Sequence, residues 1–171
     1  MKSSFLSIFI ACLLILQSTG CNSVDFERIP YQPVNIDLSS IGMWNSYGIG
    51  GLGEYRYFTL NPRQPANFPY TAKSEVGFGG ILLIGGQDPY ASSTFSVLAY
   101  DLACPVERKS TTRVTFDPNT LTAKCPECGS RYDVFSQLGN AIEGLALTEK
   151  YGLRSYPCVP GINGGYIIKN Y

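Results

Sequence analysis

The sequence predicts an all-β protein, and three observations lead to this class. Of the 171 residues, 18 are Gly, 11 are Pro, 12 are Tyr and 9 are Phe, whereas charged residues make up only 15%. Aromatic residues favour strands, and Gly and Pro favour turns. Short apolar or alternating runs, bounded by turn residues, recur along the chain. The length suits one domain with a hydrophobic core and a small appendage.

Residues 1–20 predict a lipoprotein signal peptide. A basic start precedes an apolar run over residues 5–16, which is shorter than a bilayer span and has the length of a signal-peptide core. The small residues Thr19 and Gly20 before Cys21 resemble the lipobox of bacterial lipoproteins, although a Ser stands where that motif usually has Leu. We therefore expect cleavage before Cys21 and lipid chains on its sulfur that hold the protein in a membrane.

The residue after Cys21 bears on the destination of the protein. Asn22 is not the Asp that is often associated with retention in the inner membrane, so the outer membrane of the bacterial cell envelope is favoured. The face of that membrane, periplasmic or external, stays open. The alternative is an ordinary signal peptide in which Cys21 has no role. Residues 21–30 are polar and without periodicity, and we expect a tether there before a β domain at residues 31–171.

The first half of that domain predicts two strands and two loops. Residues 34–38 alternate between apolar and polar side chains, as in a half-buried strand. A glycine-rich stretch over residues 42–53 is interpreted as a loop or a bulged strand edge. Residues 55–60 form the second strand candidate, and the three prolines of residues 61–69 indicate a loop. No helix is predicted in this half.

The second half predicts a series of strands and one weak helix. Residues 80–85 are continuously apolar between glycines, which is typical of a strand buried on both faces. The turn residues Asp117–Thr120 predict a hairpin between residues 113–116 and 121–124. Residues 141–151 favour a helix but are interrupted by Gly144. Further strands are expected over residues 95–101, 132–135, 153–159 and 164–169.

Charge and composition exclude several classes of function. The 13 basic and 13 acidic residues give a formal net charge of zero, so no nucleic-acid partner is expected. The chain has no His, which excludes a Ser-His-Asp triad and metal binding by imidazole. The carboxylates of Glu127 and Asp133 have no partner group and are interpreted as surface residues. We therefore expect the protein not to be an enzyme.

Three cysteines supply the main chemical signal. Cys125 and Cys128 are two residues apart, with Pro126 between them and a Gly-Ser pair behind, so both sulfurs belong to one tight turn. Such a turn either holds a metal or closes a disulfide. Cys104 begins a second Cys-Pro pair after the strand expected at residues 95–101. A redox-active dithiol is the weakest alternative, because strand-like residues, not a helix, follow the motif.

These stretches resemble the Rieske iron–sulfur family. The likeness covers roughly residues 76–171, and its most specific part is the run Cys125-Pro-Glu-Cys-Gly-Ser-Arg-Tyr-Asp133. The resemblance implies a small antiparallel barrel or sandwich with a rubredoxin-like subdomain of two cysteine loops at about residues 100–135. It places Cys104 and Cys125 at the cysteine positions of a [2Fe–2S] centre, and Val106 and Cys128 at its histidine positions. Val106 cannot ligate a metal, so a standard centre is not expected.

Besides the redox-active dithiol, two interpretations of the cysteines remain open. The leading one is a disulfide between Cys104 and either Cys128 or Cys125, which suits an exported protein and stabilises it by about 3 kcal/mol. It requires no cofactor and makes the domain a structural or binding module. The alternative is a [2Fe–2S] cluster or zinc on Cys104, Cys125 and Cys128, with an oxygen ligand from Glu107 or Asp101. Cys158 is expected to be a buried thiol or the partner of a leftover cysteine.

Overall fold

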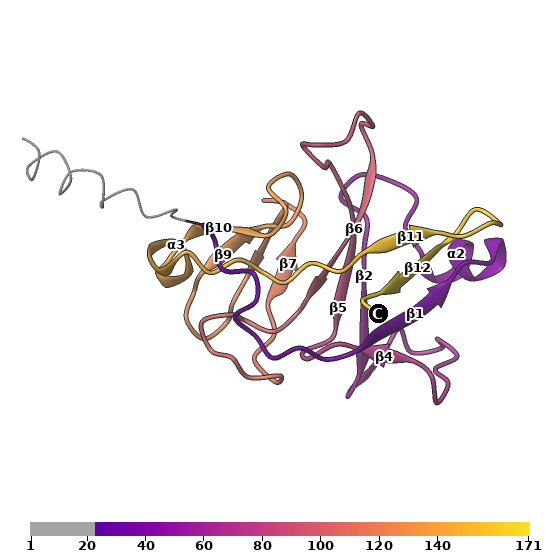
Figure 1. Cartoon of the computed structure of the whole chain (residues 1–171), viewed down its shortest axis with the longest axis horizontal. Helices are drawn as coiled ribbons and strands as arrows, with labels where there is room; N and C mark the ends of the chain where they lie inside the picture. The colour runs from indigo at the N-terminus through magenta and orange to yellow at the C-terminus, as the bar shows by residue number, and fades with distance from the viewer. Residues whose placement is uncertain (1–22) are drawn as a thin grey trace, which may run out of the picture.

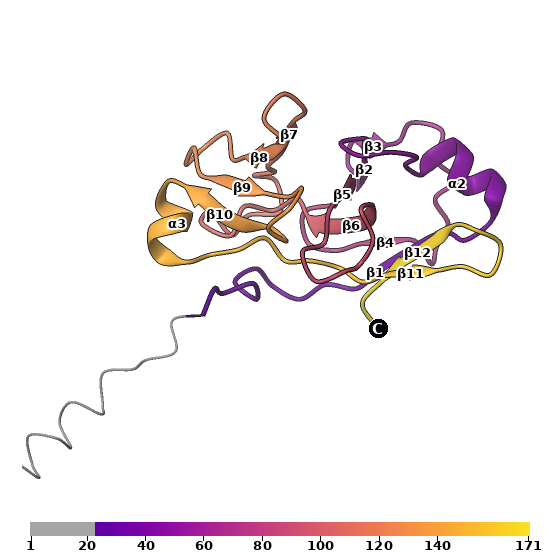
Figure 2. The ribbon, with the colours of Figure 1, turned by 90° about the horizontal axis from the view of Figure 1, so that it is seen from above.

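Residues 23–171 are described by a computed structural model, in which twelve strands form three four-stranded antiparallel sheets. Figure 1 and Figure 2 show the sheets side by side along the long axis, with one sheet between the other two. The central sheet has the strand order β3 (Arg63–Gln64), β2 (Tyr55–Leu60), β5 (Ile81–Gly86) and β6 (Ser96–Asp101). These antiparallel sheets confirm the predicted all-β class.

The other two sheets flank the central sheet. The terminal sheet has the order β11 (Cys158–Pro160), β12 (Tyr166–Lys169), β1 (Val34–Leu38) and β4 (Glu75–Val76). The cysteine sheet has the order β10 (Asn140–Glu143), β9 (Arg131–Asp133), β8 (Thr122–Lys124) and β7 (Thr115–Asp117). No pairing among the described strands closes a sheet into a barrel. The barrel part of the prediction is therefore wrong, and the three sheets are open layers.

Strand β5 is the centre of the packing, as its sequence predicts. Ile81 and Leu83 point into the apolar core shared with the terminal sheet, whereas Leu82 and Ile84 point into the core on the side of the cysteine sheet. All four side chains are completely buried. Because successive residues of a strand face opposite ways, a continuous apolar run is required where both faces are covered. Each of these side chains contributes about 1.5–3 kcal/mol by leaving water.

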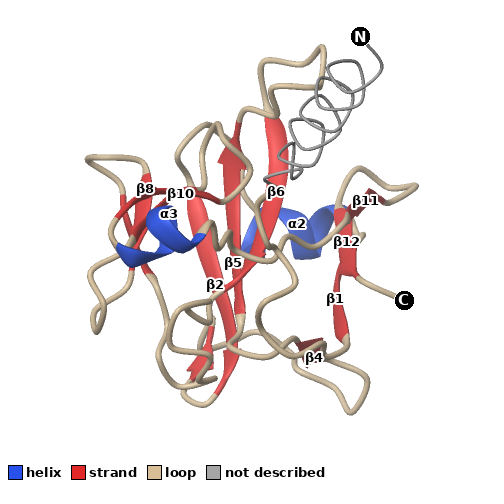
Figure 3. Cartoon of the chain, turned by 60° about the vertical axis from the view of Figure 1, so that its left-hand side comes forward, coloured by secondary structure: helices blue, strands red, loops and turns tan. Residues whose placement is uncertain are grey.

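The glycine-rich stretch contains a helix that the sequence patterns did not predict. Helix α2 (Ile41–Tyr47) begins after Ser40, whose hydroxyl accepts a hydrogen bond from the N–H of Met43 at 3.2 Å. The ring of Trp44 packs against Tyr166 of the terminal sheet, with ring centroids 4.9 Å apart. A capping serine and packing of one face therefore outweigh the low helix propensity of the glycine inside the helix. Figure 3 shows α2 in blue among the strands and loops.

The second helix starts where the sequence predicts an interruption. Gly144 has a φ of 81° and precedes α3 (Leu145–Glu149), and a Cβ atom on this glycine would lie 2.9 Å from Ser130. Glycine is thus required there by the left-handed backbone and by the close approach of the two segments. The residues before it form β10 instead of continuing the helix. The helix predicted over residues 141–151 is therefore shorter than expected.

The predicted hairpin and most of the predicted strands are confirmed, with shifted ends. Residues 115–117 and 122–124 pair with Thr115 opposite Lys124, and the carboxylate of Asp117 accepts the N–H of Asn119 at 2.9 Å within the turn. The strand expected over residues 153–159 forms only at β11 and at a single bridge from Ser155. Strands β3 and β4, of two residues each, were not predicted.

The segment expected to be a tether packs against the domain within its described part. Asp25 forms a bridge with Tyr151, and Ile29 is 2% exposed. The guanidinium of Arg154 donates to the carbonyl of Ile29 at 2.9 Å and pairs with the carboxylate of Glu27. The predicted signal peptide and Cys21 lie outside the described residues. Neither of the described helices is long and apolar enough to span a bilayer.

Candidate functional site

Two turns of the same shape hold the three cysteines. In the first turn, the N–H of Arg108 donates to the carbonyl of Cys104 at 2.9 Å. In the second, the N–H of Gly129 donates to the carbonyl of Cys125 at 3.1 Å. The donor residue has a positive φ in both turns, 54° at Arg108 and 73° at Gly129. Cys104 and Cys125 therefore each begin an equivalent five-residue turn, and Cys128 occupies the fourth position of the second turn.

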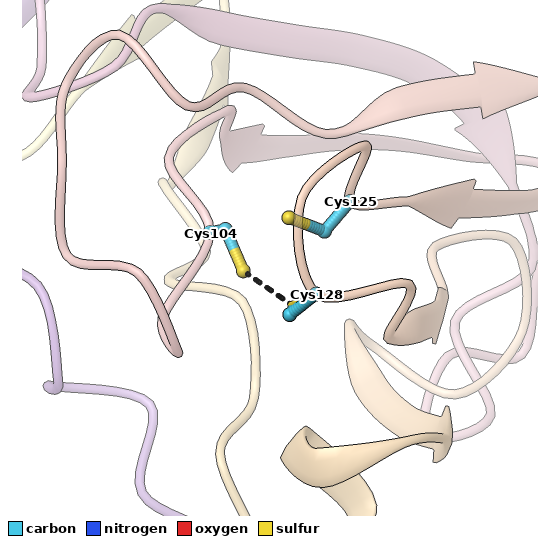
Figure 4. Close-up of side chains that lie close together, drawn as sticks. All are labelled: Cys104, Cys125 and Cys128. Atoms are coloured by element: carbon cyan, nitrogen blue, oxygen red, sulfur yellow. Dashed lines mark hydrogen bonds between the residues drawn. The ribbon is translucent and has the colours of Figure 1, made fainter.

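The three sulfur atoms meet between these turns (Figure 4). The Sγ atoms of Cys104 and Cys128 lie 3.6 Å apart, and all three Sγ atoms lie within 4.8 Å of one another. Cys104 and Cys125 are fully buried, whereas Cys128 is half-buried. The structure thus brings together the three cysteines that the sequence motifs select. A metal ion could be held by these three thiolates.

The three thiols differ in acidity because their surroundings differ. Burial raises the pKa of Cys125 to about 12 and also raises the pKa of Cys104, although the backbone N–H groups of Val106 and Glu107 partly offset it there. Burial by itself would raise the pKa of Cys128 as well, but hydrogen bonds from the hydroxyl and N–H of Ser130, together with those from Cys125 and Cys104, outweigh burial and lower the pKa of this thiol. Cys128 is therefore the first of the three to become a nucleophilic thiolate.

Two polar side chains near the sulfurs were not predicted as site residues. The hydroxyl of Tyr132 lies 3.5 Å from the Sγ of Cys104, and both residues are buried. The hydroxyl of Ser130 accepts the N–H of Ala146 at 3.1 Å, which attaches α3 to the second turn. Both residues belong to the run after Cys128, so the motif itself carried the signal. Their role is to position the sulfurs and to supply hydrogen bonds to them.

A carboxylate also ties the two turns together from the surface. Glu127 accepts a hydrogen bond from the hydroxyl of Thr112 at 2.7 Å and pairs with Lys109 at 3.3 Å. These contacts lower the pKa of the Glu127 carboxyl. The prediction that Glu127 is a surface residue is consistent with its exposure, but the side chain additionally links the loop after Cys104 to the second turn.

Neither of the two expected oxygen ligands lies with the sulfurs. The carboxylate of Asp101 is completely buried and accepts three backbone N–H groups, from Phe78 at 2.8 Å, Gly79 at 2.9 Å and Ala103 at 2.7 Å. It also accepts the hydroxyl of Tyr156 at 2.5 Å. Asp101 is therefore a structural hub and has no free lone pair directed at a metal. Among the residues that the structure describes, no carboxylate joins the three-cysteine group.

Glu107 holds the position in the first turn that Cys128 holds in the second. Its carboxylate is 3.6 Å from the Nζ of Lys109, and its side chain is 21% exposed. The expected ligand role would require this ion pair to open and the side chain to turn toward the sulfurs. The observed arrangement thus supplies three sulfur ligands, and a fourth ligand would have to come from water or from this rearrangement.

Cys158 is separate from the centre. It lies on β11, next to the core between the central and terminal sheets, and its Sγ is 3.8 Å from the carbonyl oxygen of Tyr156. Burial raises its pKa to about 12. Cys158 is a half-buried free thiol in the structure, as Cys104, Cys125 and Cys128 are also free, so its assignment as a buried thiol or as the partner of a leftover cysteine stays a prediction. It is suited to packing and not to chemistry.

The residues do not fit the cluster that the Rieske resemblance implies. Such a centre needs two imidazole ligands, the chain has no His, and Val106 packs against the apolar core. No protein-family model matches the sequence, and no curated protein is significantly similar to it. The likeness to that family therefore stays a prediction from the sequence motifs.

The unequal acidity of the thiols predicts an order of alkylation. After reduction and removal of metal, iodoacetamide at neutral pH is expected to modify Cys128 at least about tenfold faster than Cys104, Cys125 or Cys158, because only Cys128 combines partial exposure with a lowered pKa. Peptide mass spectrometry over a time course measures the four rates. Equal rates at Cys128 and Cys158 would contradict the assigned role of Ser130.

Proposed function

We propose that this chain is a lipid-anchored protein of the cell envelope, with a Rieske-like domain whose cysteine loops are closed by a disulfide between Cys104 and Cys128. The domain then acts as a structural or binding module without catalytic turnover. The observation that carries this proposal is the 3.6 Å separation of the two sulfurs, in which one partner is buried and the other is reachable from solvent. Formation of the bond requires the two Sγ atoms to approach from 3.6 Å to about 2.05 Å.

The chemistry of closure follows from the acidity of the thiols. The Cys128 thiolate attacks a disulfide of an oxidoreductase, which releases one thiolate of that protein and forms a mixed disulfide. The Cys104 thiol then loses its proton and displaces the second thiolate, so that two electrons leave the pair and the oxidant is reduced. Cys125 remains a neutral buried thiol, because its pKa of about 12 keeps it protonated. The export predicted by residues 1–20 supplies the oxidising compartment.

The Rieske-like assignment of the scaffold is supported by the two equivalent turns. Each begins with a Cys-Pro pair at the end of a strand segment and closes by the same hydrogen bond, from the fifth residue to the first. In the resembled family two such loops embrace a cluster. Here the bond between Cys104 and Cys128 takes over the task of joining them.

A zinc or iron site is the second candidate, and a separate observation favours it. The N–H groups of Val106 and Glu107 stabilise a thiolate at Cys104, and those of Glu127 and Cys128 do so at Cys125. Two sulfurs on one tetrahedral zinc ion are about 3.8 Å apart, which is close to the 3.6 Å between Cys104 and Cys128. In this alternative the protein binds metal or transfers electrons.

Thiol counting and elemental analysis separate the two candidates. The mature protein, purified without reductant, is expected to be colourless and free of zinc and iron, and to show two reactive thiols in denaturant out of the four at Cys104, Cys125, Cys128 and Cys158. Peptide mapping should recover the 104–128 pair. In the Cys158→Ser control, one thiol should disappear while the pair persists. Four thiols together with about one equivalent of metal would overturn the disulfide and support the second candidate.

A further inference from the structure

The chain enters the domain directly beside helix α3. The N–H of Asp25 donates to the carbonyl of Lys150 at 2.8 Å, and the N–H of Gly152 donates to the carbonyl of Asp25 at 3.0 Å. Val24 and Phe26 lie against Gly152 so closely that a Cβ atom there would clash with them. Figure 2 shows this entry at the end of the molecule that carries α3 and β10. The first residues of the described chain are therefore fixed to that end.

The connection between this fixed point and Cys21 is short. Only four peptide units separate Cys21 from Asp25, and they span at most about 14 Å when fully extended. This is little more than the diameter of one α-helix. A domain attached through lipid on Cys21 therefore cannot move far from the bilayer surface. Of the two ends of the molecule, the one with α3 is the end that this connection brings to the lipid.

The same end exposes aliphatic side chains. On α3, Leu145 is 49% and Leu147 is 50% exposed, on either side of the buried Ala146. Ile142 on the adjacent β10 is 37% exposed. The short helix thus turns its smallest apolar residue inward and leaves two leucines to solvent, although the reverse would bury more apolar surface. Side chains of this kind partition into the headgroup and acyl boundary of a bilayer.

Charged residues of both signs surround these aliphatic side chains, among them the exposed carboxylates of Asp25 and Glu27. Glu149 and Lys150 follow one another at the end of α3, and Glu143 pairs with Arg131 at 3.0 Å. The rim therefore carries both signs. We propose that α3, β10 and residues 24–26 form a membrane-facing surface, with Leu145 and Leu147 seated in the leaflet that holds the lipid on Cys21. This inference rests on the proposed lipid anchor.

The opposite end then points away from the bilayer. The loop between β11 and β12 contains Ile162, which is fully exposed, and Trp44 packs on β12 at the same end. Figure 1 places α2 and the β11–β12 loop at the far end of the long axis from α3. Ile162 thus offers a matched control position, because it is an exposed aliphatic residue in a loop at the opposite end of the long axis from α3.

The test uses quenching of tryptophan fluorescence by brominated lipids. Mature lipidated Leu147→Trp protein in vesicles is expected to lose about half of the added fluorescence when lipids brominated near the headgroup replace ordinary lipids, because the ring lies at the acyl boundary. Ile162→Trp and the wild type, which contains Trp44 alone, should be unaffected. Leu145→Trp provides a second variant should Leu147→Trp fold poorly, with folding checked by near-UV circular dichroism.

Flotation of the same vesicles distinguishes a failure of the proposed docking surface from a failure of the proposed lipid anchor. If the protein floats with the vesicles but neither Leu145→Trp nor Leu147→Trp is quenched more than Ile162→Trp, the docking surface is overturned while the lipid anchor stands. If the wild type does not float, the anchor fails and the docking proposal fails with it. Flotation together with selective quenching of the α3 variants supports both.

Discussion

The Asp101→Ala variant is expected to lose about 4 kcal/mol of unfolding free energy, because three backbone N–H groups and one hydroxyl would lose their buried acceptor. The carboxylate joins Phe78 and Gly79, just before β5, to Ala103 and to Tyr156 ahead of β11. It is completely buried, so water cannot replace it. A loss of this size is a large part of the stability of a small domain. Denaturant unfolding, followed by tryptophan fluorescence, measures it.

Matched substitutions identify the cause of that loss. Asp37→Ala removes an exposed carboxylate that accepts only from Ser39, and we expect a change within about 0.5 kcal/mol. Tyr156→Phe deletes one of the four donors and should cost about 1–2 kcal/mol. If Asp101→Ala were no more destabilising than Asp37→Ala, the structural role of Asp101 would be refuted. Asp101 would then again be a candidate oxygen ligand for a metal.

The second large effect concerns the redox dependence of stability. A disulfide between Cys104 and Cys128 is expected to raise the unfolding free energy of the wild type by about 3 kcal/mol over that of the reduced protein. In the unfolded chain this bond closes the loop from residue 104 to residue 128, which lowers the entropy of the unfolded state. Cys128→Ser should abolish this dependence on reductant. Comparison of each variant with and without reductant cancels the packing cost of the substitution itself. Urea midpoints under both conditions provide the measurement.

The neighbouring cysteine supplies the matched control for this prediction. Cys125→Ser should keep the full difference between oxidised and reduced protein, because the pair of Cys104 and Cys128 is intact. If Cys128→Ser keeps the difference and Cys125→Ser loses it, the bond joins Cys104 to Cys125 instead. If reductant leaves the stability of the wild type unchanged but a chelator lowers it, a bound metal and not a disulfide stabilises the domain.

Local sequence patterns predicted the strands well where the same faces of a strand are buried along its whole length. The alternation over residues 34–38 matches β1, whose Val34, Ile36 and Leu38 are completely buried, and the apolar run over residues 80–85 matches β5. The patterns failed where distant contacts decide the conformation. Helix α2 contains a glycine and is held by its packing on β12, which lies more than a hundred residues further along the chain.

The candidate site shows the same division. The Cys-Pro pairs predict turns that present sulfur, and the motifs that resemble the Rieske family were sufficient to predict that Cys104 lies near Cys125 and Cys128. The sequence could not predict that Asp101 is unable to act as an oxygen ligand. Its carboxylate accepts hydrogen bonds from residues 78, 79 and 156, which are distant from it along the chain. The unequal acidity of the thiols depends likewise on burial and on the contacts of Ser130.

The sequence by itself determined the β class, the buried central strand and the three sulfurs, because alternation, apolar runs and cysteine spacing act through neighbours along the chain. Only the tertiary structure decided that the sheets stay open, that Asp101 is a hub and that the N-terminal segment is fixed beside α3. Each of these depends on contacts between residues far apart in the sequence, which no local pattern encodes.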